Sequence, residues 1–214
     1  MTTRRLWIVG AGGFGAEVLY SLRDLHSNAG GASVEIAFAV NSPEADSFMG
    51  LAVRSMEAIG SGDEFVMAIG AGQARERIHH QLVDKGARPL SLVAPTALVG
   101  HEVAIGDGCV LSDFTMLTGR IAVGRQFQCN IYSYVAHDCV IGDFVTFAPR
   151  VCCNGNIHIG DHAYIGTGAV LKQGTPDKPL RIGAGATVGM GAVVTKDVPE
   201  GAVVIGNPAR PLER

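Results

Sequence analysis

The 214-residue sequence contains no run of 18 apolar residues and no excess of basic residues. The first absence argues against a transmembrane helix. The net charge of −3 argues against a surface for nucleic acid or for an anionic membrane. The start of the chain also has no signal-peptide h-region and cleavage site. We therefore expect a cytoplasmic protein that binds no nucleic acid and does not insert into membranes.

Metal-ligand spacing is also missing. No CxxC pair occurs among the five cysteines, so the sequence offers no zinc motif and predicts no metal site. We expect the cysteines to be small buried side chains in a reducing compartment rather than disulfides. They are Cys109, Cys129, Cys139, Cys152 and Cys153.

The second half of the chain has a strict period of six. Every sixth residue is apolar from Val93 to Leu171, over 14 positions, and the pattern resumes at Ile182. Neither a helix nor a single amphipathic strand has this period. A fixed short repeat is typical of a β-solenoid. The 11-residue step from Leu171 to Ile182 adds five residues to one hexad, and we expect a loop over residues 172–181.

The first part of the chain follows a different pattern. Short apolar strands alternate with helical segments, which favours a parallel sheet flanked by helices. The expected strands are Leu6–Val9, Glu35–Val40 and Phe65–Ile69, and the expected helices run from Ala16 to about His26 and from about Gln73 to Lys85. The pattern changes near Pro89–Pro95. We therefore expect two domains, residues 1–90 and 91–214.

A glycine-rich loop joins the first strand to the first helix. Its residues are Gly10, Gly12, Gly13, Phe14 and Gly15. A strand–turn–helix of this kind favours phosphate binding at the helix N-terminus, although a plain tight turn has the same pattern.

Other residues are expected at the same edge of the sheet. Asn41 stands where a dinucleotide site carries an acidic residue, so an amide would have to hold the ribose or base. Gly70 and Gly72 follow the third strand. Arg75 is expected either to meet a phosphate or to be solvated.

One histidine stands out by its position in the repeat. His137 is third in its hexad, off the apolar positions, and Asp138 follows it. It is interpreted either as an exposed polar corner residue or as a group that transfers protons near neutral pH. His101 lies 36 residues earlier, in an equivalent place. The remaining histidines are expected at the surface: His26, His79, His80, His158 and His162.

The hexads, the break at Lys172–Arg181 and the tail Gly206-Asn-Pro-Ala-Arg210 resemble the left-handed β-helix hexapeptide acyltransferases. Together with the glycine loop and the segment His137–Gly142, they make the chain similar to the sialic-acid O-acetyltransferase-like family. The best-understood members of this family N-acetylate nucleotide-linked amino sugars.

This resemblance implies a small Rossmann-like α/β domain followed by a left-handed parallel β-helix, in which three hexads form one coil. It also implies a homotrimer with active sites between subunits. The first domain would hold the nucleotide-linked amino sugar, and acetyl-CoA would lie along the β-helix. The implied role is in surface-glycan biosynthesis, such as that of lipopolysaccharide.

The resemblance also assigns residues. His137 matches the general base, Asp138 the acidic residue that follows it, and Asn130 a polar residue of the acceptor site. The other substrate residues would be Gly10, Gly12, Gly13, Phe14, Gly15, Asn41 and Gly70. A backbone N–H of Gly155 would face the thioester. The remaining acetyl-CoA residues would be Ile165, Gly166, Gly189, Asn207, Pro208 and Arg210.

The chain departs from its relatives at Phe14, where many carry histidine, and at Thr146, where some carry a second histidine. Two other functions remain open on the residues alone. One is an O-acetyltransferase acting on a sugar hydroxyl, such as that of a sialic acid. The other is a non-catalytic β-helix that serves as a scaffold or binding protein. The loop at residues 172–181 is expected near the acetyl-CoA channel.

Overall fold

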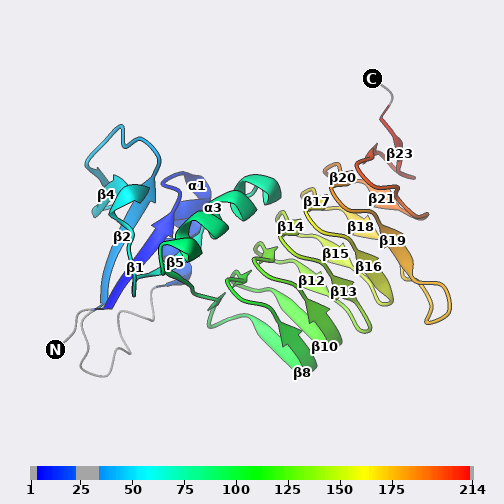
Figure 1. Ribbon diagram of the computed structural model, residues 1–214. Coiled ribbons are helices and arrows are strands. Elements are labelled where there is room, and N and C mark those ends of the chain that lie inside the picture. Colours follow the sequence, from blue (N-terminus) through cyan, green and yellow to red (C-terminus); the bar gives the residue numbers. More distant parts are fainter. Residues whose placement is uncertain (1–3, 23–33, 213–214) are drawn as a thin grey trace.

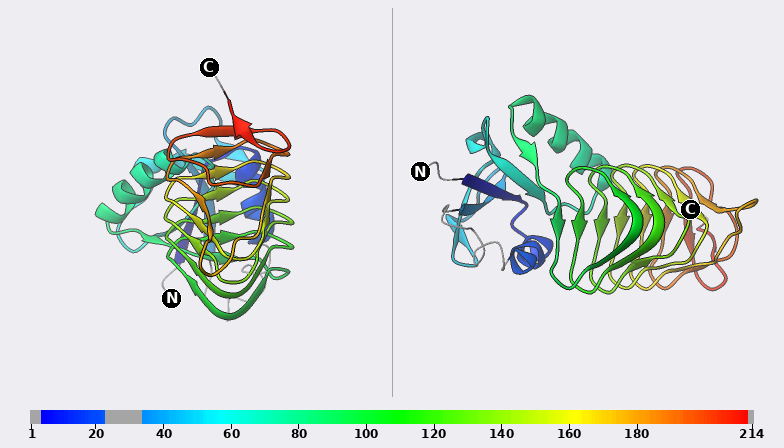
Figure 2. Two further views of the ribbon diagram at one scale, coloured as in Figure 1. Left: turned by 90° about the vertical axis from the view of Figure 1, so that its right-hand side faces the viewer. Right: turned by 90° about the horizontal axis from the view of Figure 1, so that it is seen from below.

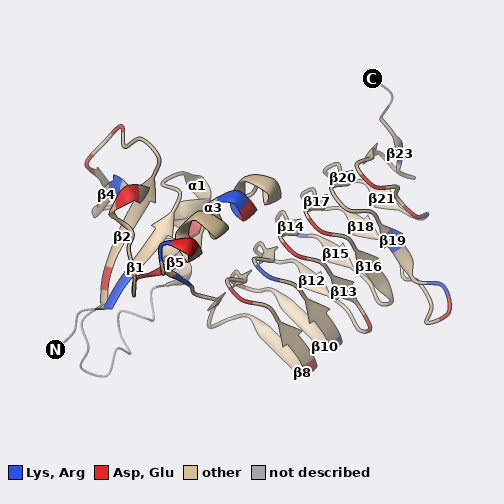
Figure 3. Ribbon diagram, viewed as in Figure 1, with Lys and Arg blue, Asp and Glu red and all other residues tan. Residues whose placement is uncertain are grey.

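The computed structural model describes residues 4–22 and 34–212. An α/β part is followed by a stack of parallel coils, and the chain ends at the far end of that stack (Figure 1). Two further views show the coils rising along one axis with the α/β part at their base (Figure 2). Within the described residues, no helix is long and apolar enough to cross a membrane. Acidic and basic residues are interspersed over both parts (Figure 3).

The α/β part contains a six-stranded sheet with the order β3-β4-β2-β1-β5-β6. All its neighbouring strands pair in parallel except β3 with β4. The strands are β1 (Arg4–Val9), β2 (Val34–Val40), β3 (Ser47–Phe48), β4 (Leu51–Ser55), β5 (Glu64–Met67) and β6 (Arg88–Pro89), with α1 (Gly13–Ser21), the 3-10 helix η1 (Met56–Ala58) and α3 (Gly72–Asp84).

Apolar side chains point to both faces of this sheet, which explains why helices cover both. In β1, Leu6 and Ile8 pack in one cluster with Val18 of α1. Trp7 and Val9 point the other way, into a cluster that includes Ile78 of α3. Successive side chains of a strand point to opposite faces, so one apolar strand supports both layers. Helix α1 begins three residues earlier than expected, and the end of its expected range, with His26, lies outside the described residues.

The coils build three columns of short strands. One column forms its own sheet, made of β7 (Leu92–Val93), β9 (Val110–Leu111), β11 (Gln128–Cys129), β14 (Thr146–Phe147), β17 (Tyr164–Ile165), β20 (Thr187–Val188) and β22 (Val203–Ile205), with β23 (Arg210–Pro211) antiparallel at its end. A second sheet holds the other two columns. One contains β12 (Tyr134–Val135), β15 (Cys152–Cys153), β18 (Val170–Leu171) and β21 (Val193–Val194). The other contains β13 (Val140–Ile141), β16 (Ile157–Ile159) and β19 (Leu180–Ile182). The longer β8 (Leu98–Ile105) and β10 (Met116–Val123) join these two columns.

The register shows that three hexads make one coil. Cys129 pairs with Phe147, 18 residues later, and Phe147 pairs with Ile165. The side chains of these three residues are fully buried in one core. After the loop, Ile159 pairs with Ile182, so the five extra residues leave the stacking intact. The arrangement fits the expected β-helix. Val93 and Val99 differ from the pattern, because both are exposed in the first coil, which has no coil beneath it.

Most corners of the coils use a residue in the left-handed backbone region. Arg120, Asp138 and Asn156 have φ values of 51°, 58° and 57° and stack at one corner. Non-glycine residues take this conformation at a cost of about 1–2 kcal/mol each. The corners are therefore held in place by the ladder of hydrogen bonds and the core rather than by local preference.

The structure corrects two expectations for α3, because Arg75, expected to meet a phosphate or to be solvated, and His79, expected at the surface, are both buried. The Arg75 guanidinium donates hydrogen bonds to carbonyl oxygens of Ile69 and Gly70 in its own part, and to those of Gln126, Phe144 and Val145 in the coils. Burial lowers its pKa to about 9, so it remains charged at neutral pH. Arg75 thus ties the two parts together and does not meet a phosphate.

His79 is buried beside this arginine. The Gln126 side-chain amide lies 3.1 Å from His79 Nδ1. Burial is the largest cause that lowers the pKa of His79, followed by the charges of its neighbours His80 and Arg125. Of the other histidines, His162 is only 22% exposed and stacks on Phe144. The His79 contact arises because α3 lies against the coils, which no local pattern records, whereas His162 stacks on Phe144 because the two residues are one coil apart.

Candidate active site

His137 lies at the turn between β12 and β13. We call this corner of the coils the His137 edge, defined by His101, Gly119, His137, Gly155 and Gln173. The His137 side chain is 47% exposed, and its Nδ1 lies 2.6 Å from Asp138 Oδ2. Nδ1–H therefore donates to the carboxylate, and Nε2 has no partner among the described residues. A neutral imidazole held in this way presents a free base at Nε2.

Asp138 is held from the coil below. Arg120 donates from Nε to Asp138 Oδ1 at 2.7 Å and from Nη2 to Oδ2 at 2.9 Å. Arg120 and then His137 hold the pKa of the Asp138 carboxyl well below its usual value. The carboxylate is therefore charged throughout the neutral range.

Gly155 lies directly above the imidazole. A Cβ placed on Gly155 would be 2.5 Å from Cε1 and 2.6 Å from Nε2 of His137. Such contacts are far shorter than van der Waals distance, so only glycine lets the ring occupy this position. Among the described residues, the Gly155 N–H finds no acceptor. In the part of the chain that the structure describes, an imidazole with no partner at Nε2 and a glycine whose N–H has no acceptor therefore lie against each other.

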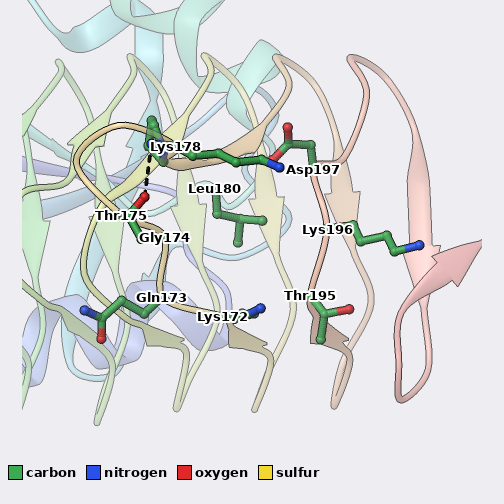
Figure 4. Close-up of a pocket in the computed structure, with 10 residues that line it drawn as sticks. Lys172, Gln173, Gly174, Thr175, Lys178, Leu180, Thr195, Lys196 and Asp197 are labelled. Atoms are coloured by element: carbon green, nitrogen blue, oxygen red, sulfur yellow. Dashed lines mark hydrogen bonds between the residues drawn. The ribbon is translucent and has the colours of Figure 1, made fainter.

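An open pocket of about 520 Å³ lies above Gly155 on the same edge, where the Gly174 N–H donates to the Gly155 carbonyl at 3.0 Å. Figure 4 shows the residues that line this pocket. The loop between β18 and β19 forms one wall, where the Lys178 N–H donates to Thr175 Oγ1 at 3.1 Å. Three lysines line it, which favours an anionic ligand. Its lining residues are Lys172, Gln173, Gly174, Thr175, Lys178, Pro179, Leu180, Thr195, Lys196 and Asp197.

A second pocket of about 280 Å³ continues this surface to the tail of the chain. It shares Thr195, Lys196 and Asp197 with the first pocket and adds Arg210. Asn207 and Pro208, joined by a cis peptide bond, are exposed just before Arg210. The expected loop and tail residues thus adjoin one another along the upper coils.

A third pocket, of about 190 Å³, lies between the α/β part and the coils. It brings together three residues that the sequence assigned to the substrate, Phe14, Gly70 and Asn130. Thr146 also lines it, and its hydroxyl donates to the Gly70 carbonyl at 2.8 Å. Gln128 donates to the Met67 carbonyl at 2.9 Å. The walls of this pocket are therefore fixed to each other by hydrogen bonds.

The glycine loop divides into structural and open positions. A Cβ at Gly10 or Gly15 would clash with backbone carbonyls, and Gly10 has a φ of 114°. Gly12 and Gly13 have open space around them, and Gly12 caps α1 without a side-chain hydrogen bond. This leaves the N-terminus of α1 accessible to an anion. Asn41 is exposed after β2 and lines none of the pockets described above.

The structure does not bring all the expected residues together within one chain. Asn130 lies at a different corner of the coils, which we call the Asn130 edge, defined by Ser112, Asn130, Ala148, Gly166 and Gly189. None of the residues lining the third pocket belongs to the His137 edge. Ile165 is fully buried in the core, so only its backbone is accessible to a ligand. His137 and the third pocket of one chain therefore lie on different parts of the coils.

The sequence analysis did not identify Arg120 or the three lysines. A signal for Arg120 was present, because it precedes Asp138 by 18 residues, the length of one coil. Opposite charges at that spacing stack directly. The lysines lie before, within and above a loop whose course the hexads do not determine, so their convergence had no signal in the repeat.

Comparisons with known proteins cover nearly the whole chain, although no family model matches it. A curated relative, GDP-perosamine N-acetyltransferase from Escherichia coli O157:H7, is 50% identical over 70% of this chain and 68% of its own length. The solved structure of WeeI from Acinetobacter baumannii AYE is 49% identical, with a TM-score of 0.93 over 98% of this chain and all of that one. The acetyltransferase domain of PglB from Neisseria gonorrhoeae FA1090, solved with acetyl coenzyme A, is 29% identical, with a TM-score of 0.86 over 99% of this chain and all of that one.

Proposed function

Because this chain belongs to the hexapeptide-repeat acetyltransferases that act on nucleotide-linked amino sugars, we propose that it transfers the acetyl group of acetyl-CoA to the amino group of such a sugar. One observation in the structure supports this best. The His137 ring, whose Nε2 has no partner among the described residues, lies against Gly155, whose N–H has no acceptor there. These are the groups that direct acyl transfer to an amine requires.

His137 acts as the general base. An amine that attacks a thioester must lose a proton, and Nε2 accepts it while Asp138 holds Nδ1–H. The same nitrogen then supplies a proton to the departing sulfur. No acyl-enzyme is needed. Burial raises the pKa of the Cys109 thiol to about 12, which keeps it from serving as a nucleophile at neutral pH.

The Gly155 N–H stabilises the negative charge that develops during the transfer. This N–H is available to the oxygen that becomes negative as the tetrahedral intermediate forms. Donors of this kind contribute about 3–4 kcal/mol to transition-state stabilisation. The absence of a side chain keeps this N–H and the His137 ring within reach of the same reacting group.

We expect Gly155→Ala to lower kcat about 10- to 100-fold, because the new methyl group must push the His137 ring away from its position. The melting temperature should change little, since the ring is half exposed and can turn outward. Steady-state thiol release and thermal melting measure the two effects. Gly60→Ala is the control, because nothing lies within 4 Å of a Cβ there. A kcat of Gly155→Ala equal to that of the wild type would contradict the close-packing argument.

Acetyl-CoA would extend upward from His137 along the same edge. The residues present fit this ligand, because the lysine-lined pocket lies above Gly155 and continues to Arg210. The lysines and Arg210 would meet its phosphates, with Asn207 and Pro208 beside them. The loop at residues 172–181 would then form one wall of the channel, as the sequence predicted.

We expect Lys196→Gln to raise the KM for acetyl-CoA about tenfold and to leave kcat nearly unchanged, because a charge-assisted hydrogen bond to phosphate contributes about 1.5–3 kcal/mol. Lys196 is the test residue because it lines both upper pockets. The effect should shrink as salt is added. Lys85→Gln, in the α/β part, serves as the control. An unchanged KM would place the phosphates elsewhere.

The nucleotide would bind the α/β part, in a Rossmann-like mode. The open N-terminus of α1 would face its phosphates, and the third pocket, with Phe14, Gly70 and Asn130, would hold the sugar. GDP-perosamine is the first substrate to test, because the E. coli relative is named for it. We further propose that the protein acts in the cytoplasm, in surface-glycan synthesis such as that of lipopolysaccharide.

A homotrimer would complete the active site. His137 and Asn130 lie at different corners of one chain, so the sugar held by one subunit must reach the base of another. Phe114 and Tyr132 stack at 5.0 Å near the Asn130 edge and are more than half exposed, as expected for a surface that a second copy covers. In this assembly, Gly166, Gly189 and the backbone of Ile165 would line the acetyl-CoA channel of the neighbouring subunit.

The proposed function is tested by incubating the full chain with acetyl-CoA and GDP-perosamine and measuring free thiol together with the mass of the sugar product. We expect thiol release and acetylation of the amine. A matched GDP-sugar with a hydroxyl in place of the amine distinguishes O-acetylation. If acetyl-CoA binds by calorimetry but neither sugar reacts, the substrate assignment is wrong. If acetyl-CoA does not bind, the non-catalytic alternative is favoured.

A further inference from the structure

Arg120 forms a bidentate ion pair with Asp138, the residue that holds His137. It lies on β10, one coil below Asp138, and its guanidinium binds both carboxylate oxygens, at 2.7 and 2.9 Å. One of these oxygens, Oδ2, also accepts the hydrogen bond from His137 Nδ1. The three side chains therefore form a continuous chain from Arg120 through Asp138 to the base.

We propose that Arg120 is a positioning residue for the acetyl transfer, a proposal that rests on the function proposed above. Arg120 fixes the plane of the Asp138 carboxylate, and that plane fixes the ring of His137 under Gly155. The single hydrogen bond that Asp138 accepts from His137 would leave the carboxylate free to rotate. The bidentate contact removes this freedom, and guanidinium provides it where an ammonium group would not.

The charge of Arg120 has a second effect. Facing this chain of residues are Glu102 from the coil below and the buried Cys139, while Gly155 and Asn156 from the coil above carry no charge. Glu102 and Asp138 are both acidic, so Arg120 is the cation that balances them. Without it, the Asp138 carboxylate beside His137 would be uncompensated, which favours the protonated ring. A protonated ring cannot act as a base.

An arginine elsewhere in the coils provides a matched control. Arg125 binds Asp143, also 18 residues later, from Nε at 3.0 Å and from Nη2 at 2.6 Å. This pair lies at another corner of the coils, next to Phe144 and away from His137. It has the same spacing and the same chemistry but does not touch the base. Any general effect of losing a surface ion pair should be the same at both sites.

The test compares Arg120→Gln, Arg120→Lys and Arg125→Gln by the pH dependence of kcat/KM. For Arg120→Gln we expect the acid limb to move to higher pH by about one unit, which lowers kcat/KM about tenfold on that limb. At alkaline pH the charge effect should disappear and only a smaller loss from the misplaced ring should remain, while the KM for acetyl-CoA should stay the same. In Arg120→Lys the acid limb should move by less than in Arg120→Gln. In Arg125→Gln it should stay at the pH of the wild type.

Two results would overturn the proposal. One is an equal loss at every pH, with the limb in place and with the same loss in Arg125→Gln, which is the result of a purely structural role. The other is a change confined to the KM for the nucleotide sugar, which would make Arg120 a substrate contact. Titration of the His137 ring by NMR in the substrate-free protein separates this proposal from the proposed function. A midpoint that moves up in Arg120→Gln supports the positioning role even if the wild type acetylates no sugar.

Discussion

His137→Ala is expected to lower kcat by about 10²- to 10⁴-fold, the usual contribution of a general base. The amine would have to lose its proton to water, while Gly155 and the acetyl-CoA pocket remain in place. KM for acetyl-CoA should therefore change little. Steady-state thiol release with saturating nucleotide sugar measures the effect, and calorimetry measures acetyl-CoA binding separately.

The control for this variant is His101→Ala. His101 lies on the same edge two coils lower, and its side chain is exposed. Its loss should leave kcat within about twofold of the wild type, since surface substitutions rarely disturb the fold. Near-normal turnover by a well-folded His137→Ala protein would refute the role of this histidine.

Arg75→Met is expected to lower the free energy of unfolding by roughly 3 kcal/mol or more. The guanidinium donates to five backbone carbonyl oxygens and to the Gln128 side chain, all in a buried region. Methionine fills most of the space but donates nothing. Each buried acceptor left without a donor costs about 1–3 kcal/mol.

Thermal melting followed by circular dichroism measures this loss. For a chain of this size, a loss of that magnitude corresponds to a drop in Tm of roughly 6–12 °C. Arg77→Met is the matched control, because Arg77 lies on the same helix and is exposed. Its effect should stay within about 0.5 kcal/mol. Equal melting temperatures for the two variants would show that Arg75 does not hold the two parts together.

The coils were predictable from the sequence because each buried position repeats locally. The core needs one apolar side chain in every hexad, and the pairing of Cys129 with Phe147 follows from counting 18 residues. The placement of Gly155 above His137 follows from the same count. A regular stack thus translates spacing in the sequence directly into spacing in the structure.

Contacts between the two parts could not be predicted in this way. Arg75 is separated by 51 to 70 residues from its partners in the coils, and no periodic pattern links them. The same holds for His79, whose burial depends on where α3 lies. The expected ligand contact of the Ile165 side chain was wrong for a different reason. Its place in the apolar series already requires its side chain to be in the core, so a direct ligand contact was inconsistent with the repeat.

The loop between β18 and β19 has a consequence for engineering. Ile159 pairs with Ile182 as though the extra residues were absent, so the register of the coils does not depend on the length of this segment. The loop can therefore be exchanged as a cassette, with both ends anchored in the ladder. Because it walls the lysine-lined pocket, such exchanges offer a way to alter selectivity for the acyl donor while the base, its carboxylate and the sugar pocket stay as they are.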